Sequence, residues 1–330
     1  MPFPYPKYSA IRKSRDSGWH KQILNQHKQY NKMATLKALK IRIGSVASSE
    51  KITGAMKMIS SAKVHKNERA LKQLLPFKNQ IKSIMGHILE SGDNFNSPLT
   101  QDREVHNVGV VVFGSDDGLC GAYNMNIFKR LLQEIAALHE RYGKDVKITV
   151  FPIGKKIAAA CRRLEKLSVD TQTFPGIDSK MEGETVNDFT HRLREMFLNG
   201  TLDLVEVVYM QFHSISRQVL TIDPLFPVST TTLFEGAEAQ DKGEENKLYL
   251  FEPDPNSIFN EVLPMFVLST MQEITIENRA SEQAARVMAM QAANDNAKKL
   301  QEELQLEFNK LRQQGITTEL LDILGGQVER

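Results

Sequence analysis

The run "FVLSTMQEITIENRASEQAARVMAMQAANDNAKKLQEELQLEFNKLRQQ", residues 266–314, contains neither glycine nor proline. If it is helical throughout, it spans about 70 Å at 1.5 Å per residue. A single domain of this size has a diameter not far above about 40 Å. Such a helix must therefore project from the body of the protein or pair with another long element. We expect a C-terminal helical segment over residues 257–330.

A second long helix is predicted near the N-terminus, within residues 33–92. Apolar residues recur there at three- and four-residue steps, which place them in one stripe of a helix. The stripe consists of Leu36, Leu39, Ile43 and Val46, followed by Ile52, Ala55, Ile59 and Ala62. We expect one helix over residues 34–75 that ends before Pro76. Two long helices at opposite ends of a chain, joined through a compact middle, predict an antiparallel coiled coil.

The middle of the chain, residues 105–235, alternates between apolar runs and helical patterns. The runs "HNVGVVVFG", "VKITVFPIG" and "LVEVVYMQFHS" are typical of buried strands, and residues 123–142, 155–164 and 185–198 have helical periodicity. This alternation predicts a Rossmann-like α/β domain with a mostly parallel sheet. Residues 236–256 are acidic and lack periodicity, so we expect a surface loop that leads into the last helix.

The stretch "GSDDGLCGAYN" follows the first predicted strand, where ligands bind in open α/β sheets. Its three glycines raise the question of a phosphate site, but the stretch matches neither of the usual glycine-rich phosphate patterns. Asp116 and Asp117 also place negative charge where a phosphate would lie. The sequence therefore favours a structural turn, with Gly118 and Gly121 supplying its conformational freedom.

Polar side chains of this stretch are expected to hold the turn in place. Asp116 or Asp117 would accept hydrogen bonds from backbone amides of the turn, and Asn124 or Asn126 would cap the next helix. Cys120 has no histidine within its own motif to activate it, so we expect a small buried residue and not a catalytic thiol.

Composition excludes several other classes of function. The 42 basic and 40 acidic residues nearly cancel, to a net charge of +2, which gives no support for nucleic-acid binding. No apolar stretch approaches the roughly 20 residues that span a bilayer, so direct membrane insertion is not expected. Two isolated cysteines and eight scattered histidines form no metal-ligand pattern. We expect no catalytic residues, no cofactor and no metal.

Residues 1–32 form a basic N-terminal extension that is expected to be disordered. They carry seven lysines or arginines, one acidic residue, Asp16, and prolines at positions 2, 4 and 6. The segment lacks the apolar core of a secretory signal. Two interpretations remain open: the segment is a targeting or tail sequence, or translation begins at Met33.

Three stretches together carry a resemblance to a known family. "MATLKALKIRIGSVASSEKITGAMKMISSAK", "GSDDGLCGAYN" and "ENRASEQAARVMAMQAANDNAKKL" with the C-terminal "LQLEFNKLRQQGITTELLDILGG" resemble the signature regions of the gamma subunit of F-type ATP synthase, in the same order. The resemblance spans Met33 to Gly326. It implies a central rotor shaft without an active site of its own, which couples proton-driven rotation of the c-ring to ATP synthesis or hydrolysis at the beta subunits.

The resemblance also implies partners and a location. The partners are the alpha3beta3 hexamer of F1, the c-ring of Fo and a small rotor subunit of the epsilon or delta type. The protein would be peripheral to the membrane, on the cytoplasmic face of the bacterial inner membrane. The alternative is the matrix side of the mitochondrial inner membrane, because of the basic N-terminal segment.

Contact residues follow from the resemblance position by position. Met56 and Lys57 match a helix face that meets the lower lobes of the beta subunits, and Arg286 matches the motif arginine of the facing helix. The polar contacts of the family with the upper ring correspond to Gln313, Thr317 and Glu319. The pattern alone also allows a core position for Met56 and solvated helix faces for Arg286, Gln313 and Glu319.

Two other classes of function stay open at the level of sequence. A nucleotide-binding α/β enzyme with a coiled-coil oligomerisation module would bind nucleotide at residues 114–121. A plain coiled-coil scaffold would bind partners without turning. Restoration of ATP hydrolysis to alpha and beta subunits that are inactive without this chain would distinguish a rotor from both.

Overall fold

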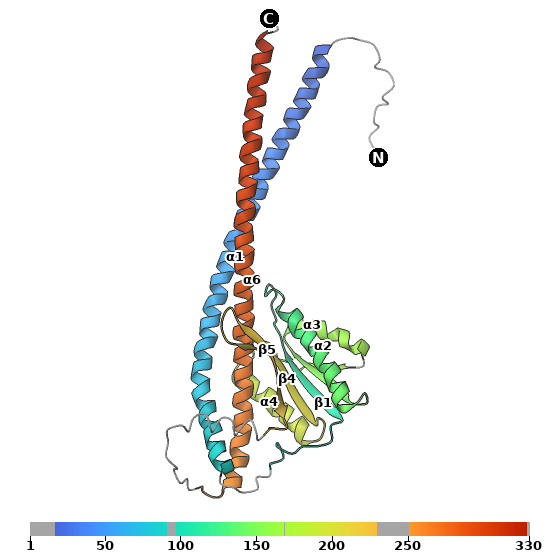
Figure 1. Cartoon of the computed structure of the whole chain (residues 1–330), viewed down its shortest axis with the longest axis vertical. Coiled ribbons are helices and arrows are strands. Elements are labelled where there is room, and N and C mark those ends of the chain that lie inside the picture. The colour runs from blue at the N-terminus through green and yellow to red at the C-terminus, as the bar shows by residue number, and fades with distance from the viewer. Residues whose placement is uncertain (1–16, 91–96, 168, 230–250, 329–330) are drawn as a thin grey trace. The chain divides into compact units, whose positions relative to one another are not determined.

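The computed structural model describes residues 17–90, 97–167, 169–229 and 251–328 (Figure 1). Most of the expected acidic loop, residues 236–250, and residues 1–16 of the N-terminal extension lie outside this range. The chain divides into two compact units. One consists of residues 1–53 with 293–330, and the other of residues 54–292.

Two long helices, α1 (Ser17–Glu90) and α6 (Pro255–Val328), account for both ends of the described chain. Helix α6 begins two residues before the expected start. Helix α1 begins at Ser17, which differs from the expectation of disorder through residue 32. The run from Trp19 to Ile43 contains no glycine or proline, so nothing in its composition interrupts a helix.

Helix α1 also continues through Pro76, so the prediction that it ends there is wrong. A proline inside a helix removes one hydrogen bond and costs about 3 kcal/mol. The turns that follow Pro76 carry Ile81, Met85 and Ile88, which are buried in the largest hydrophobic core. Burial of these three side chains offsets the cost of the lost hydrogen bond.

The middle of the chain forms one five-stranded sheet in the order β3-β2-β1-β4-β5. Its strands are β1 (Asn107–Phe113), β2 (Lys147–Ile153), β3 (Asp170–Thr171), β4 (Leu204–Phe212) and β5 (Gln218–Phe226). All neighbouring pairs are parallel except β4 and β5. The predicted α/β domain with a mostly parallel sheet is confirmed, and β3 and the antiparallel β5 are additions to the three predicted strands.

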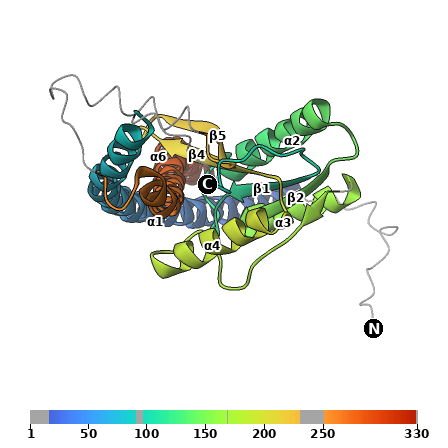
Figure 2. The same cartoon turned by 90° about the horizontal axis from the view of Figure 1, so that it is seen from below.

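Helices cover both faces of this sheet (Figure 2). Helices α2 (Tyr123–Tyr142) and α3 (Lys155–Cys161) pack on one face, and a short 3₁₀ helix, η1 (Arg162–Leu167), follows α3. Helix α4 (Glu184–Leu198) packs on the other face, together with parts of α1 and α6. Successive residues of β1 enter the two cores alternately, with Val110 and Val112 on the α2 face and Val111 and Phe113 on the α4 face.

The buried stripe of α1 departs from the predicted one. Ile52 and Ile59 are 60% and 58% exposed, although the sequence pattern placed them in the stripe. The buried positions are instead Ser60 and Val64. Ser60 lies two heptads after Val46 and Val64 lies four residues further on, so the heptad pattern continues along the helix. Val64 packs against Ala280, Ala284 and Val287 of α6. The prediction from apolar periodicity therefore assigned the wrong residues of this part of α1 to the buried stripe.

Candidate functional site

The loop "GSDDGLCGAYN" connects β1 to α2 and is tightly constrained. A Cβ atom on Gly114 would lie 2.5 Å from the Cβ atom of Ile157 in α3, so only glycine fits at this position. Leu119 and Gly121 have left-handed backbones, with φ of +63° and +62°. The prediction of a turn that needs Gly121 is confirmed, whereas Leu119, and not Gly118, takes the other left-handed position.

Side chains of the loop form hydrogen bonds with neighbouring backbone N–H groups and hydroxyls. Asp116 is buried, and its carboxylate accepts hydrogen bonds from the Lys155 backbone N–H (2.9 Å) and the Ser179 hydroxyl (2.8 Å). The Asn124 amide oxygen accepts from the Ser115 N–H at 3.0 Å, and its Nδ2 donates to the Ser115 hydroxyl at 2.7 Å. Asp116 thus binds the first turn of α3 and not, as predicted, an amide of its own turn.

The electrostatics of the loop disfavour a phosphate. The Asp116 carboxylate already occupies the N-terminal end of α3, where an anion would otherwise be favoured. Asp117 is exposed and lies 3.3 Å from the ammonium group of Lys180. The hydrogen bond from Lys180 lowers the pKa of Asp117, so its negative charge persists at neutral pH.

Asn278 of α6 joins the helix to three elements of the α/β domain. Its side chain is fully buried, and its Nδ2 donates to the carbonyl oxygen of Gly114, at the end of β1, at 3.2 Å. Its Oδ1 accepts from the Tyr123 hydroxyl of α2 at 2.6 Å and from the Met210 N–H of β4 at 3.4 Å. One amide therefore satisfies three buried polar groups of the domain.

Arg286, two helical turns further along α6, closes over the same loop. Its Nε donates to the carbonyl oxygen of Gly118 at 3.2 Å, and its guanidinium also reaches the Asp117 carbonyl at 3.5 Å and the Glu282 carboxylate at 2.6 Å. Burial raises the pKa of Glu282, while the hydrogen bond from Arg286 opposes this shift. The sequence placed Arg286 on a partner-facing or solvated helix face; in the structure it is buried within its own chain.

Three further polar contacts fix the same length of α6. Lys78 of α1 forms an ion pair with Glu273 of α6. Arg279 pairs with Glu182, which precedes α4, and Gln272 donates to Asn187 of α4 at 3.0 Å. We call the contacts of residues 272–286 with the domain the α6 joint. The joint binds one stretch of helix to the sheet, to α1, α2 and α4, and to the loop after β1.

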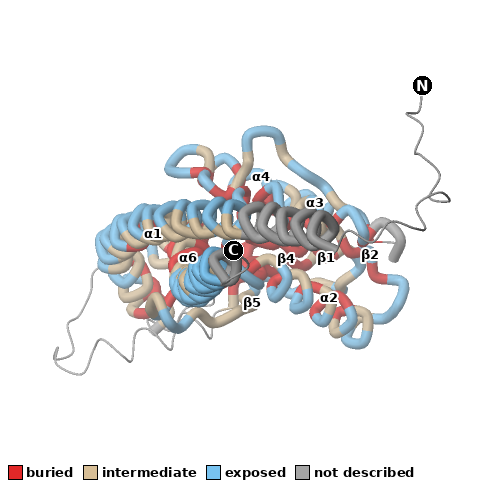
Figure 3. The backbone as a smooth tube through the Cα atoms, turned by 90° about the horizontal axis from the view of Figure 1, so that it is seen from above, coloured by how far each residue is buried: buried red, intermediate tan, exposed pale blue. Residues whose placement is uncertain are grey.

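The remaining predicted site residues lie outside the α6 joint. Met56 and Lys57 are half-buried on α1, next to the exposed Met58. Gln313, Thr317 and Glu319 are exposed on α6, towards its C-terminal end, which Figure 3 shows as an exposed helix. The Thr317 hydroxyl donates to the Gln313 carbonyl oxygen at 3.0 Å. The structure thus separates the six predicted contact residues into a buried arginine, a half-buried pair and an exposed group.

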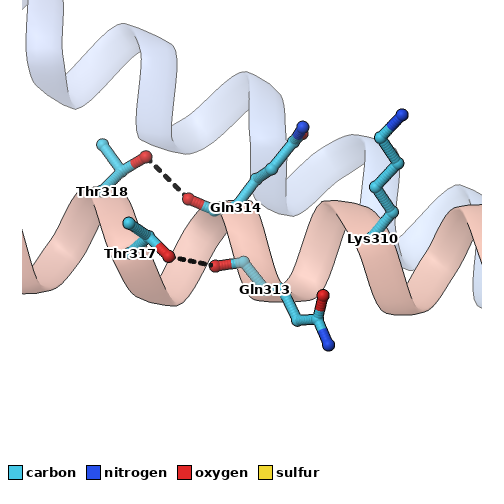
Figure 4. Close-up of a pocket in the computed structure, with 5 residues that line it drawn as sticks. All are labelled: Lys310, Gln313, Gln314, Thr317 and Thr318. Carbon is cyan, nitrogen blue, oxygen red and sulfur yellow. Dashed lines mark hydrogen bonds between the residues drawn. The ribbon is translucent and has the colours of Figure 1, made fainter.

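The exposed group borders a shallow open groove. Lys310, Gln313, Gln314, Thr317 and Thr318 line it, all from α6 (Figure 4). These side chains offer amides, hydroxyls and one ammonium group but no carboxylate. Such a surface can form hydrogen bonds with a partner, while it offers no group suited to acid–base chemistry at neutral pH.

Clusters that could hold a metal ion are absent from the described part of the chain. Within residues 17–90, 97–167, 169–229 and 251–328, no three histidine, cysteine, aspartate or glutamate residues are arranged to hold a metal ion. Burial raises the pKa of the Cys161 thiol to about 12, which keeps it protonated. Among the helices in these ranges, none combines the length and apolar character that a membrane span needs.

The fold and the α6 joint define a class of protein in which an α/β domain is fastened to two very long helices. The sequence profile of the ATP synthase family matches residues 35–328. The ATP synthase gamma chain of Bacteroides thetaiotaomicron is 37% identical over 302 residues, covering 90% of this chain and 100% of the relative. That of Parabacteroides distasonis is 38% identical over 295 residues, covering 89% and 98%.

Solved structures show the same fold. A chain of the Euglena gracilis mitochondrial ATP synthase, in its OSCP/F1/c-ring assembly, has a TM-score of 0.58 at 19% identity, covering 90% of this chain and 94% of that chain. A chain of the rotor of the same enzyme has a TM-score of 0.55 at 18% identity, covering 86% and 99%. This chain belongs to the ATP synthase gamma chain family. It is the central rotor shaft of the F1 sector, which couples c-ring rotation to ATP synthesis and hydrolysis.

Proposed function

We propose that α1 and α6 form the shaft as an antiparallel coiled coil, and that the α6 joint makes the α/β domain turn with it. Contacts within each unit support the pairing. Val64 packs on Ala284 in one unit, and the Asn294 amide donates to the Glu50 carbonyl oxygen at 2.8 Å in the other. Within the unit of residues 54–292, Lys78 pairs with Glu273 and Val64 packs on Ala284, so residue numbers on α6 rise as those on α1 fall, which is the order of antiparallel helices.

Heptad spacing supports the same pairing in the unit of residues 1–53 and 293–330. Partly or fully buried positions follow three- and four-residue steps on both helices, between exposed neighbours. On α1 they are Leu36, Leu39, Ile43, Val46, Glu50 and Thr53, and on α6 they are Ala297, Gln301, Leu304, Phe308, Leu311 and Gly315. Two stripes of equal period on two helices are the pattern of a coiled-coil seam.

The shaft acts mechanically, and catalysis belongs to the beta subunits. A rotor turns its partners through their cycle by presenting a different face to each in turn. The partners are the alpha3beta3 hexamer, the c-ring and a small rotor subunit of the epsilon or delta type. The similar solved chains come from a rotor and from an OSCP/F1/c-ring assembly, which supports the first two of these partners.

Exposed and half-buried side chains on the shaft supply the partner contacts. Met56 and Lys57 would face the lower lobes of the beta subunits, and Gln313, Thr317 and Glu319 the upper ring. Beyond them the C-terminal turns of α6 expose an apolar face that water would disfavour. It consists of Ile316, Leu320, Leu321, Ile323 and Leu324. An apolar sleeve of alpha and beta subunits would enclose this face with contacts that change little with angle.

The complex would hold this chain at a membrane surface without insertion. The cytoplasmic face of a bacterial inner membrane is the proposed location, because gamma chains of Bacteroides and Parabacteroides are similar to this chain over most of its length. The matrix side of a mitochondrial membrane is the alternative.

The α6 joint is the observation that carries this function, and rotation of the α/β domain tests it. Lys144 is exposed between α2 and β2, and both native cysteines are buried, so Lys144→Cys can be labelled selectively with a bead. In complexes held to a surface through the beta subunits, we expect the bead to turn in one direction when ATP is added. ATP hydrolysis at normal rates with a stationary bead would overturn the proposal.

A further inference from the structure

Five ionisable side chains lie together where α6 meets α1, β4 and β5. Glu273 and Glu277 are one turn apart on α6 and therefore lie on the same side of this helix. Lys78 of α1 forms an ion pair with Glu273. The Tyr209 hydroxyl of β4 donates to the Asp223 carboxylate of β5 at 2.8 Å. We call these five residues the acid cluster, and all of them belong to the unit of residues 54–292.

Electrostatic effects within the acid cluster join its two halves. The charges of Glu273, Lys78 and Asp223 all act on Glu277. Burial raises the pKa of Tyr209 far above its ordinary value, and the charges of Asp223, Glu277 and Glu273 raise it further. Glu277 therefore faces titratable groups of α1, β4 and β5 as well as one of its own helix.

The acid cluster holds three carboxyl groups but one ammonium group. Lys78 pairs with Glu273, and Asp223 accepts from Tyr209, so each of these two carboxylates has a partner. Glu277 is only 6% exposed. Burial, together with the negative charges of Glu273 and Asp223, raises its pKa to about 8, although the charge of Lys78 opposes the shift. Glu277 is thus mostly protonated at neutral pH.

Ionisation of Glu277 would weaken the contact between α6 and the sheet. An ionised carboxylate is unfavourable in a buried site unless it is paired, and here it would also repel Glu273 and Asp223. Exposure of Glu277 to water would return its pKa to an ordinary value near 4.5. The proton therefore favours the packed arrangement, and each pH unit below the native pKa favours it about tenfold.

We propose that the acid cluster is a proton-dependent clamp within the α6 joint. Glu277 holds α6 against β4 and β5 while it carries a proton, and loss of the proton to water loosens this contact. The inference rests on the proposed function, because it takes the α6 joint as the link between the shaft and the α/β domain. A rise in pH on the side of the membrane where the chain lies would make this link less rigid.

Infrared difference spectroscopy of the full chain tests the protonation of Glu277. The C=O stretching band of a protonated carboxyl group should be present at about pH 6 and should disappear with a midpoint at about pH 8. Glu277→Gln should lack this band at every pH. Glu273→Gln should move the midpoint to lower pH, because it removes a like charge and frees Lys78 to pair with Glu277. Absence of the band from the unaltered chain at about pH 6 would overturn the proposal.

Hydrogen exchange of peptides that cover residues 272–286 tests the loosening. The ratio of the exchange rate in the unaltered chain to that in Glu277→Gln, taken at equal pH, cancels the chemical effect of pH on exchange. We expect this ratio to rise about tenfold between pH 7 and pH 9, because only the unaltered chain loses a buried proton in this range. A ratio that does not change with pH would refute the clamp.

Glu303→Gln is the matched control, because Glu303 is an exposed glutamate of α6 in the other unit and should exchange as the unaltered chain does. If Glu277→Gln does not fold by circular dichroism, Glu273→Gln still decides, since the pH at which exchange increases must then fall with the infrared midpoint. A failed clamp would leave rotation of the bead at residue 144 as expected, and a stationary bead would leave both measurements on the clamp unchanged.

Discussion

Replacement of Asn278 by alanine should be among the most damaging single changes to this fold. The change leaves the Gly114 carbonyl and the Met210 N–H without the partner that the Asn278 side chain gives them in a buried position. The Tyr123 hydroxyl keeps the Asn278 backbone carbonyl as its acceptor at 3.1 Å. At about 1–3 kcal/mol for each of the two groups, the free energy of unfolding should fall by about 2–6 kcal/mol. Tyr123→Phe leaves both of these groups bonded to Asn278 and should cost about 1 kcal/mol.

Urea unfolding of the full chain measures these losses, with Asn260→Ala as the matched control. Asn260 is also on α6, but the one hydrogen bond of its amide within the described residues goes to the Asn256 carbonyl one turn earlier, so its loss should cost little. The double variant of Asn278 and Tyr123 should lose less than the sum of the single losses, because the two share a hydrogen bond. If Asn278→Ala unfolds within about 1 kcal/mol of the control, the α6 joint does not hold the helix as argued.

Three further predictions follow from burial, space and charge. Val64→Ser should lower the free energy of unfolding by about 2 kcal/mol or more, because Val64 is fully buried. Ile59→Ser should change it by less than about 0.5 kcal/mol, because Ile59 is exposed. Equal losses would contradict the assignment of buried and exposed positions on α1. Gly114→Ala should lower the melting temperature, because the added Cβ atom would lie 2.5 Å from the Cβ atom of Ile157 in α3. Gly118→Ala should leave the melting temperature unchanged, because its added Cβ atom would lie 3.9 Å from the nearest atom, in Lys156. Burial raises the pKa of Glu277 to about 8. The native chain therefore binds the extra proton, and stability should fall as pH rises from about 5 to about 8. Glu277→Gln should flatten that slope in unfolding curves measured across this range, and an unchanged slope would refute the assignment.

Local signals in the sequence determined the elements of the fold. Each of the three predicted strands is predominantly apolar, because the inner strands of the sheet are buried on both faces. Helix α2 begins and ends at the predicted residues, since its periodicity is strong and Gly143 follows it. The absence of glycine and proline over residues 266–314 determined the long last helix.

The wrong predictions arose where local sequence preferences compete with contacts between segments that are distant in the chain. Pro76 is a local reason to end α1, and the core contacts of Ile81, Met85 and Ile88 outweigh it. Ile52 and Ile59 have the apolar character of a helix seam, but Val64 is the α1 residue that packs on Ala280 and Ala284 of α6. Neither outcome can be computed from one helix considered alone.

The sequence by itself determined the long last helix, three of the five strands and, through three motifs, the family. Only the tertiary structure decided what the polar side chains of α6 do. Asn278 and Arg286 resemble solvated positions on a helix, and they become buried because the loop after β1, more than 150 residues earlier in the chain, folds against them. Hydrogen bonds between segments so distant leave no periodic trace in the sequence, since their partners are backbone groups that every residue carries.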